Sequence, residues 1–229
     1  MAVLDYVKNN YTSLAEEVDR LGKEAGRKVT LVAVTKSGSD EELLALANAG
    51  VSDIGENRPT ELQRRGDLLM KSGYMPRLHE IGNLQRNKVK LIVGEVYLIH
   101  SLDSLELAKE IDKQAKKIDR KIKVLIEINS GRESQKGGIM PEDAEEFYLK
   151  VKELSHIEVV GLMTMGPVCE DSEEMRPYFR ETKELFDRLN RRYGFPGGGI
   201  LSMGMSDSYK VAIEEGSTLV RVGRKLFIK

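Results

Sequence analysis

The N-terminal part of the chain shows two hydrophobic patterns in succession. Across residues 3–25, apolar side chains recur every three or four positions, including Leu4, Val7 and Leu14, which is the pattern of an amphipathic helix. Residues 29–34 follow, a β-branched run in which nearly every side chain is apolar. Parallel strands that are covered on both faces have this composition. The pattern therefore predicts a helix and then a fully buried strand.

The same unit of buried strand and amphipathic helix repeats to the end of the chain. Strands are predicted at residues 29–35, 51–55, 77–81, 96–101, 122–129, 157–163, 199–203 and 218–222. Helices are predicted at residues 40–49, 58–72, 84–94, 103–118, 142–154, 173–193 and 207–216. Repetition without a break in composition predicts an α/β fold, a single (β/α)8 barrel of the TIM type over residues 1–229, with an extra N-terminal helix. Only a short segment follows the last strand, so we expect the helix at 3–25 to occupy the position of the eighth barrel helix.

A doubly wound sheet is the alternative for this alternation of strands and helices. Such a sheet would place a glycine-rich turn after the first strand, but Thr35-Lys36-Ser37-Gly38-Ser39 has no G-x-G-x-x-G pattern. The turn therefore favours the barrel.

Composition and charge limit the classes of partner. The net charge is −1, from 36 basic and 37 acidic residues, whereas proteins that track a nucleic-acid backbone carry a basic excess. Neither a signal peptide nor a stretch of the ~20 apolar residues that span a membrane is recognisable. The single cysteine, Cys169, has no basic neighbour in the sequence to activate it. We expect a cytoplasmic protein that binds neither nucleic acid nor membrane, with Cys169 playing no chemical part.

Lys36 directly follows the first buried strand, where a barrel places its chemistry. Partial removal of a lysine from water favours the neutral amine, which forms Schiff bases with carbonyl compounds. A lysine that simply extends from the strand end into solvent is an equally good interpretation of this position by itself.

A second group of polar residues follows the seventh and eighth predicted strands. Ser202 and Ser206 lie before a helix, and Arg221, Gly223 and Arg224 end the last strand. Hydroxyl groups and free amides at such positions bind phosphate in many barrels, although Ser206 alone could be a plain N-cap. A reactive lysine opposite a phosphate site fits pyridoxal 5′-phosphate (PLP), and equally a Schiff-base aldolase that acts on a sugar phosphate. Residue spacing leaves these alternatives open.

The remaining candidates have structural interpretations. His79 is expected to be a core histidine with satisfied hydrogen bonds. The three histidines, at positions 79, 100 and 156, are too few and too scattered to predict a zinc site.

Several motifs together resemble the PLP homeostasis proteins, barrels that are similar to the N-terminal domain of alanine racemase. The resembling segments are residues 31–36 (LVAVTK), 55–57 (GEN), 79–88 (HEIGNLQRNK), 99–104 (IHSLDS), 161–164 (GLMT), 201–206 (LSMGMS) and 216–223 (GSTLVRVG), together with Asn129, Glu133, Lys136 and Gly138. They occur in order over nearly the whole chain, which makes the resemblance specific.

The resemblance implies a role for each candidate residue. Lys36 would carry PLP as a Schiff base, and Asn57 would line the pocket. The phosphate would be held by Ser202, Ser206 and the turn at Gly223 and Arg224. Arg221 would face the pyridine nitrogen, and a permanently charged arginine there leaves the ring a weaker electron sink than a carboxylate partner does.

Two positions depart from the family pattern. Arg224 replaces a small hydroxyl residue, so the resemblance assigns a phosphate contact to its backbone N–H and none to its side chain. Arg58-Pro59 follows Glu56-Asn57 where an aromatic residue is usual, and we expect this to alter the lip of the pocket.

These implications predict a protein of PLP homeostasis that stores and delivers the cofactor without dedicated turnover. We expect PLP-dependent apo-enzymes as recipients, and a monomer or weak homodimer. An amino-acid racemase is the first alternative and a Schiff-base aldolase the second. Racemisation in the resembling enzyme needs a tyrosine from a separate C-terminal domain, and we expect that domain to be absent because the chain ends at Lys229.

Overall fold

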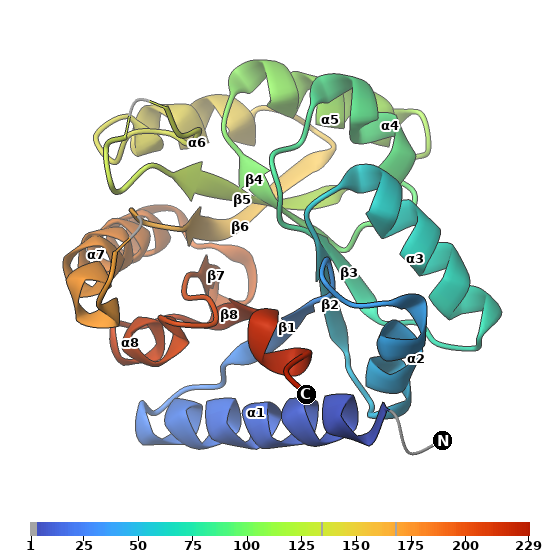
Figure 1. Ribbon diagram of the computed structural model, residues 1–229. Helices are drawn as coiled ribbons and strands as arrows, with labels where there is room; N and C mark the ends of the chain where they lie inside the picture. Colours follow the sequence, from blue (N-terminus) through green and yellow to red (C-terminus); the bar gives the residue numbers. More distant parts are fainter. Residues whose placement is uncertain (1–3, 134, 168) are drawn as a thin grey trace.

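The centre of the molecule is a closed barrel of parallel strands. A computed structural model describes residues 4–133, 135–167 and 169–229. Each strand pairs with the next in sequence, and β8 pairs with β1 to close the barrel (Figure 1). The strands are β1 (Thr30–Val34), β2 (Asp53–Glu56), β3 (Arg77–Glu80), β4 (Leu98–Leu102), β5 (Ile122–Ile128), β6 (Ile157–Thr164), β7 (Ile200–Ser202) and β8 (Leu219–Val222). This confirms the predicted (β/α)8 fold.

Helices surround the barrel and connect its strands. The α-helices are α1 (Asp5–Glu24), α2 (Asp40–Asn48), α3 (Pro59–Lys71), α4 (Val89–Ile92), α5 (Leu105–Lys116), α6 (Ala144–Lys152), α7 (Arg176–Tyr193) and α8 (Tyr209–Glu214). Short 3₁₀ helices are η2 (Arg86–Lys88), η3 (Ser172–Met175), η4 (Pro196–Gly198) and η5 (Arg224–Leu226). Among the described helices, none has the length and apolar character needed to cross a membrane.

Two predicted helices are broken up in the structure. The helix expected at 84–94 is the turn η2 followed by the short helix α4, because the backbone of Gln85 is still extended. The helix expected at 173–193 begins with η3, and α7 starts only at Arg176, immediately before Pro177. Proline fits the first turn of an α-helix and disrupts its interior, which explains this boundary.

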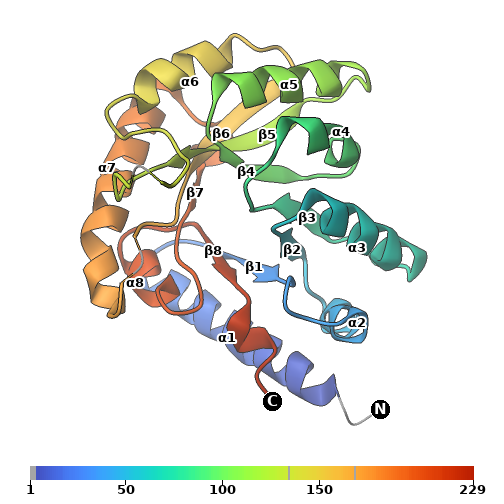
Figure 2. The same ribbon diagram turned by 45° about the horizontal axis from the view of Figure 1, so that its top comes forward.

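The N-terminal helix covers the position where an eighth barrel helix would lie. It packs against α2 on one side and α8 on the other, outside β1 and next to η5 (Figures 1 and 2). Val7, Leu14 and Val18 form its buried face. The position expected for the extra helix is therefore confirmed.

Two hydrophobic cores result from the alternation of side chains along the strands. One lies between the strands and the surrounding helices and includes Ile54, Val124 and Val220. The other fills the barrel interior with Val32, Leu98, Leu125, Val160, Met163 and Leu219. The strands end in polar residues beyond this inner layer, and those ends surround the candidate site.

Candidate functional site

A hollow of about 570 Å³ lies at the C-terminal ends of the strands. Its wall contains Lys36 after β1, Asn57 after β2, and Arg221, Gly223 and Arg224 in and after β8. The β7–α8 loop contributes Ser206, and the segment after β6 contributes Met165 and Cys169. A hollow of this size suits a small cofactor. It brings together six of the seven residues that the sequence predicted for the site.

Lys36 lies in the wall of the hollow, but its side chain is exposed. Of the two interpretations left open for this position, the structure agrees with a lysine that extends from the strand end into solvent. Thr35, which directly follows β1, is fully buried, and the side chain of the next residue, Lys36, extends beyond the strand end. Lys136 lines the same hollow and forms an ion pair of 2.6 Å with Glu133. The sequence identified Lys136 only through the family resemblance.

The loop that carries Lys36 is fixed from below by a buried ion pair. Arg65 of α3 donates a hydrogen bond of 2.8 Å to the carboxylate of Glu56, and both side chains are buried. The same guanidinium donates to the backbone carbonyls of Thr35 and, at 2.7 Å, of Gly38. These bonds hold the backbone on both sides of Lys36.

Glu56 completes this anchor under the loop. The hydroxyl of Thr35 donates to its carboxylate. Burial raises the pKa of Glu56, and the hydrogen bonds from Thr35 and Arg65 oppose that rise. Sequence reasoning placed Glu56 at a strand end but did not identify Arg65, which looks like any other basic residue in a helical pattern.

Free backbone amides occur at other residues of the same wall. Among the residues that the structure describes, the N–H groups of Ser206, Asp207 and Arg224 have no hydrogen-bond acceptor. The N–H of Gly223 donates to the hydroxyl of Ser206 at 3.4 Å. Unpaired amides beside a hydroxyl group bind anions well. This wall therefore fits a phosphate group.

Gly223 is required where β8 ends. A Cβ atom at this position would lie 2.9 Å from the carbonyl oxygen of Val34. The glycine allows the ends of β8 and β1 to approach each other, which brings its amide and Lys36 into one hollow.

The side chain of Arg224 is occupied by a neighbour. Its guanidinium donates to the carboxylate of Asp207, and both side chains are largely exposed. A phosphate at the amides would have to share this guanidinium with Asp207. The backbone of Arg224 fits the predicted role, whereas its side chain is paired across the mouth of the hollow.

Asn57 presents an unpaired acceptor in the same hollow. Its Oδ1 atom is buried and has no hydrogen-bond partner among the described residues. Buried polar atoms without partners are rare, and a ligand commonly satisfies them. The adjacent Arg58 is exposed, and its backbone is extended immediately before Pro59 begins α3. This pair therefore positions α3.

Ser202 and Arg221 meet inside the barrel. Ser202 is fully buried, and its hydroxyl accepts a hydrogen bond from Nη1 of Arg221. Arg221 also donates to the backbone carbonyl of Thr164 at 3.1 Å. The phosphate contact predicted for Ser202 stays a prediction, and the structure shows that this hydroxyl holds Arg221.

Burial shifts the charges around Arg221. Desolvation lowers the pKa of the guanidinium to about 10, so it remains protonated at neutral pH. Glu127, at the end of β5, is buried nearby, and burial raises the pKa of its carboxyl to about 7. Arg221 is thus a fixed cation in the wall of the hollow, whereas Glu127, whose carboxyl titrates near neutrality, is not among the described residues of that wall.

The remaining residues named from the sequence take structural places. His79 is buried, with hydrogen-bond partners on both ring nitrogens, which confirms the prediction of a satisfied core histidine. The described residues contain no cluster of histidine, cysteine and acidic side chains that could hold a metal. Burial raises the pKa of the Cys169 thiol, with nearby Glu174 adding to the rise, so the thiol stays protonated and weakly nucleophilic.

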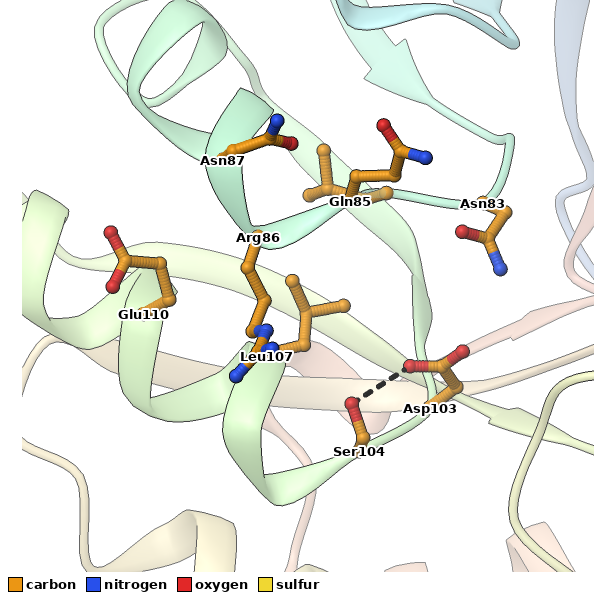
Figure 3. A pocket seen from close by; sticks show the side chains of 9 residues that line it. Asn83, Gln85, Arg86, Asn87, Asp103, Ser104, Leu107 and Glu110 are labelled. Atoms are coloured by element: carbon orange, nitrogen blue, oxygen red, sulfur yellow. Dashed lines mark hydrogen bonds between the residues drawn. The ribbon is translucent and has the colours of Figure 1, made fainter.

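A second hollow, of about 720 Å³, lies between η2 and the start of α5. Asn83, Gln85 and Asn87 approach it from one side, and Asp103, Ser104 and Glu110 from the other (Figure 3). Arg86 is the one cationic side chain among the described residues of its wall. The wall lacks a lysine within the described residues, so this hollow does not fit a cofactor held through an amine.

The chain is similar to known proteins over almost its whole length. Residues 10–228 match the family described as the alanine racemase N-terminal domain. A pyridoxal phosphate homeostasis protein of Aquifex aeolicus (strain VF5) is 42% identical over 215 residues, which cover 93% of this chain and 93% of the relative. A pyridoxal phosphate homeostasis protein of Helicobacter pylori (strain ATCC 700392 / 26695) is 34% identical, and the match covers 98% of this chain and 99% of the relative.

A solved structure extends the similarity to a protein with a ligand. PipY of Synechococcus elongatus PCC7942, with PLP bound, matches with a TM-score of 0.83 and 26% sequence identity. The match covers 97% of this chain and 100% of PipY.

Proposed function

The chain belongs to the alanine racemase N-terminal domain family and, within it, to the pyridoxal phosphate homeostasis proteins, and from this premise we propose that it binds PLP in the hollow beside Lys36. The cofactor would be joined to Lys36 as a Schiff base, and residues 1–229 would act as one PLP-binding domain. The protein would store PLP and deliver it to apo-enzymes.

One observation carries this proposal. Lys36 and the free amides at Ser206 and Arg224 line the same hollow. An amine and an anion site in one hollow match the two reactive ends of PLP, its aldehyde and its phosphate. The relatives named above and the PLP-bound PipY structure support the same ligand.

Different residues of the wall would bind different parts of the cofactor. Ser206, Gly223 and the backbone of Arg224 would hold the phosphate, and Ser202, which the resemblance also places at the phosphate, would hold Arg221. Asn57 would gain a partner for its unpaired oxygen. Arg221 would face the pyridine nitrogen and, as a permanent donor, would keep that nitrogen unprotonated.

We expect binding without dedicated turnover. Bound PLP supplies a ring that withdraws electrons from an amino acid joined to its aldehyde carbon, and the positive charge of Arg221 limits that withdrawal by excluding a proton from the ring. Efficient racemisation also needs a second base, and acid–base catalysis contributes about 10²–10⁴ in rate. Within the described wall there is neither a tyrosine nor a histidine, and Glu170 and Asp171 are exposed.

The test compares release with catalysis. The purified chain loaded with PLP is mixed with an apo-enzyme whose activity reports transfer, and its α-proton exchange with amino acids is followed in deuterated water. We expect recovery of the apo-enzyme's activity and negligible exchange. Rapid, stereospecific exchange on any amino acid would instead establish the racemase. Absence of visible absorbance after addition of PLP would favour the aldolase that acts on a sugar phosphate.

A further inference from the structure

Polar side chains form a continuous hydrogen-bond chain through the interior of the barrel. Oδ1 of Asp53 lies 2.9 Å from Nε2 of His79, whose Nδ1 lies 2.9 Å from Nε2 of His100. Nδ1 of His100 lies 3.0 Å from the hydroxyl of Ser202, which accepts from Arg221. The five side chains come from β2, β3, β4, β7 and β8 and are all nearly or fully buried. The hydrogen-bond chain thus joins the base of the barrel to the residue that we place at the pyridine nitrogen.

The chemistry of the two ends assigns a direction to every bond. A guanidinium only donates and a carboxylate only accepts, while each neutral imidazole has one donor and one acceptor. Arg221 therefore donates to the hydroxyl of Ser202, and that hydroxyl donates to Nδ1 of His100. Nε2–H of His100 then donates to Nδ1 of His79, and Nε2–H of His79 donates to Asp53. The reverse arrangement, with neutral rings, would place a lone pair of His79 against the carboxylate of Asp53. Both histidines must therefore be Nε2–H tautomers.

The surroundings of His79 favour its neutral form. Desolvation lowers its pKa, and the charge of Arg77 on the same strand adds to this effect, while the hydrogen bond to Asp53 opposes it. The ring of Tyr97 packs on the same imidazole, with centroids 5.4 Å apart. His100, from β4, is a further titratable neighbour of this ring, with its Nε2 atom 2.9 Å from Nδ1 of His79.

His100 is held neutral more strongly. Burial is complete and pushes its pKa well below the usual value, and the charge of Arg221 acts in the same direction. A protonated ring at this position would carry N–H on both nitrogens, so Nδ1 could no longer accept from Ser202, and its charge would lie close to that of Arg221. The neutral, one-directional hydrogen-bond chain is thus the arrangement that the burial and the charges both favour.

We propose that His100 and His79 are positioning residues that hold Arg221 against the pyridine nitrogen of bound PLP, through a one-directional hydrogen-bond chain that ends on Asp53. This rests on the proposed function for the identity of the ligand. The negative charge of Asp53 polarises each bond in turn and makes the Ser202 hydroxyl a stronger acceptor for Arg221. Arg77 fixes Asp53 by donating to both of its carboxylate oxygens, at 2.8 and 2.6 Å.

The hydrogen-bond chain can be tested without any cofactor. Nitrogen-15 spectra of the full protein, freed of PLP and labelled at histidine, distinguish protonated from unprotonated ring nitrogens. We expect the two buried histidines to carry one proton each, on Nε2, with the His156→Gln variant identifying the third signal. A proton on Nδ1 of either buried ring, or on both nitrogens at neutral pH, would overturn the assigned direction.

To test whether the hydrogen-bond chain acts through the pyridine nitrogen, PLP is compared with a ligand that lacks this nitrogen. Affinity is measured for PLP and for its 1-deaza analogue, in which carbon replaces the pyridine nitrogen. The His100→Leu variant breaks the hydrogen-bond chain and should weaken PLP about tenfold or more while leaving the analogue nearly unchanged. The His100→Gln variant, whose amide can accept from Ser202 and donate to His79, should restore most of the affinity. His156→Gln is the matched control.

The outcomes separate this inference from the proposed function. If the unmodified protein fails to bind PLP, the proposed function is wrong, and the link of the hydrogen-bond chain to a cofactor falls with it. If it binds PLP and His100→Leu weakens PLP and the analogue equally, the function stands and the positioning role is overturned. Should His100→Leu not fold, the near-isosteric Asp53→Asn variant removes the charge at the far end, and the same selective loss for PLP is expected. Equal affinities for PLP in Asp53→Asn and the unmodified protein would contradict the role of Asp53.

Discussion

Arg65 and Glu56 form an ion pair of 2.8 Å that is buried beneath the loop carrying Lys36. Arg65 also binds the carbonyls of Thr35 and Gly38, so a single side chain of α3 ties β2 to the backbone on both sides of Lys36. The pair therefore serves both the stability of the fold and the position of the amine.

Replacing Arg65 by Met should destabilise the protein by about 3–5 kcal/mol, because it leaves the carboxylate of Glu56 buried without its partner. Chemical denaturation measures this loss. The matched control is Arg64→Met on the same helix, whose ion pairs with Asp40 and Glu61 are half exposed and should contribute less than about 1 kcal/mol.

The double variant Arg65→Met with Glu56→Leu should recover much of that stability, since no unpaired charge stays buried. Its affinity for PLP should still be reduced, because the carbonyls of Thr35 and Gly38 lose their donor. Similar stabilities for the Arg64 and Arg65 single variants would show that the buried pair does not anchor the loop.

Ser206 and Ser202 should respond differently to two forms of the ligand. Ser206→Ala removes a hydroxyl from the anion site and should weaken PLP by about ten- to a hundredfold, with little effect on pyridoxal, which lacks the phosphate. Ser202→Ala removes the acceptor of Arg221 and should weaken both ligands alike. Titrations followed by absorbance distinguish the two patterns. If Ser202→Ala weakened the binding of PLP but not of pyridoxal, Ser202 would be a phosphate ligand.

Asp207 should oppose phosphate binding at the mouth of the hollow. Its carboxylate is paired with Arg224, so Asp207→Asn removes a negative charge and releases the guanidinium. We expect PLP to bind about two- to fivefold more tightly, an effect that declines at high salt because the site is exposed. Pyridoxal is the control ligand. Weaker binding of PLP in the variant would mean that Asp207 instead holds the residues of the anion site in place.

Glu80 should make the stability depend on pH. Burial raises the pKa of this carboxyl from 4.5 to about 8, with nearby Glu56 adding to the rise. The folded chain therefore holds this proton more tightly than the unfolded chain, and the free energy of unfolding falls as the pH rises from 4.5 to about 8. The full contribution is present below pH 4.5 and is lost at about pH 8.

The Glu80→Gln variant should remove this dependence. It should match the unmodified protein near pH 4.5 and be more stable above about pH 8, by roughly 1.4 kcal/mol for each unit of the shift that it abolishes. Denaturation curves over this range provide the difference, with the exposed Glu153→Gln as the matched control. A difference that stays constant with pH would show that Glu80 is ionised in the folded state.

Much of the fold was predictable because parallel strands in a barrel are covered on both faces, so each strand is a continuous apolar segment in the sequence. Their C-terminal ends share one face of the barrel. That rule alone places Lys36 after β1 and Ser206 and Gly223 after β7 and β8 around one hollow, although the chain separates them widely. The breaks in the helices depended on local backbone, as at Gln85 and Pro177, and periodicity does not detect these.

The contacts inside the barrel were beyond the reach of the sequence. His100 and Ser202 are 102 positions apart, and whether each side chain points inward depends on strand parity. Register shifts in the pairing of β4 with β5 and of β5 with β6 alter that parity. Arg65 is equally hidden, because a buried arginine and an exposed one look alike in a helical pattern until their partners are known.

The central claim is that Lys36 carries PLP, and covalent trapping tests it most directly. The protein is loaded with PLP, reduced with borohydride, digested and mapped by mass spectrometry, with Lys136→Ala as the control because Lys136 lines the same hollow. We predict the pyridoxyl group on the peptide that contains Lys36, in the unmodified protein and in Lys136→Ala alike. Finding it mainly on Lys136 or on another lysine would contradict the account.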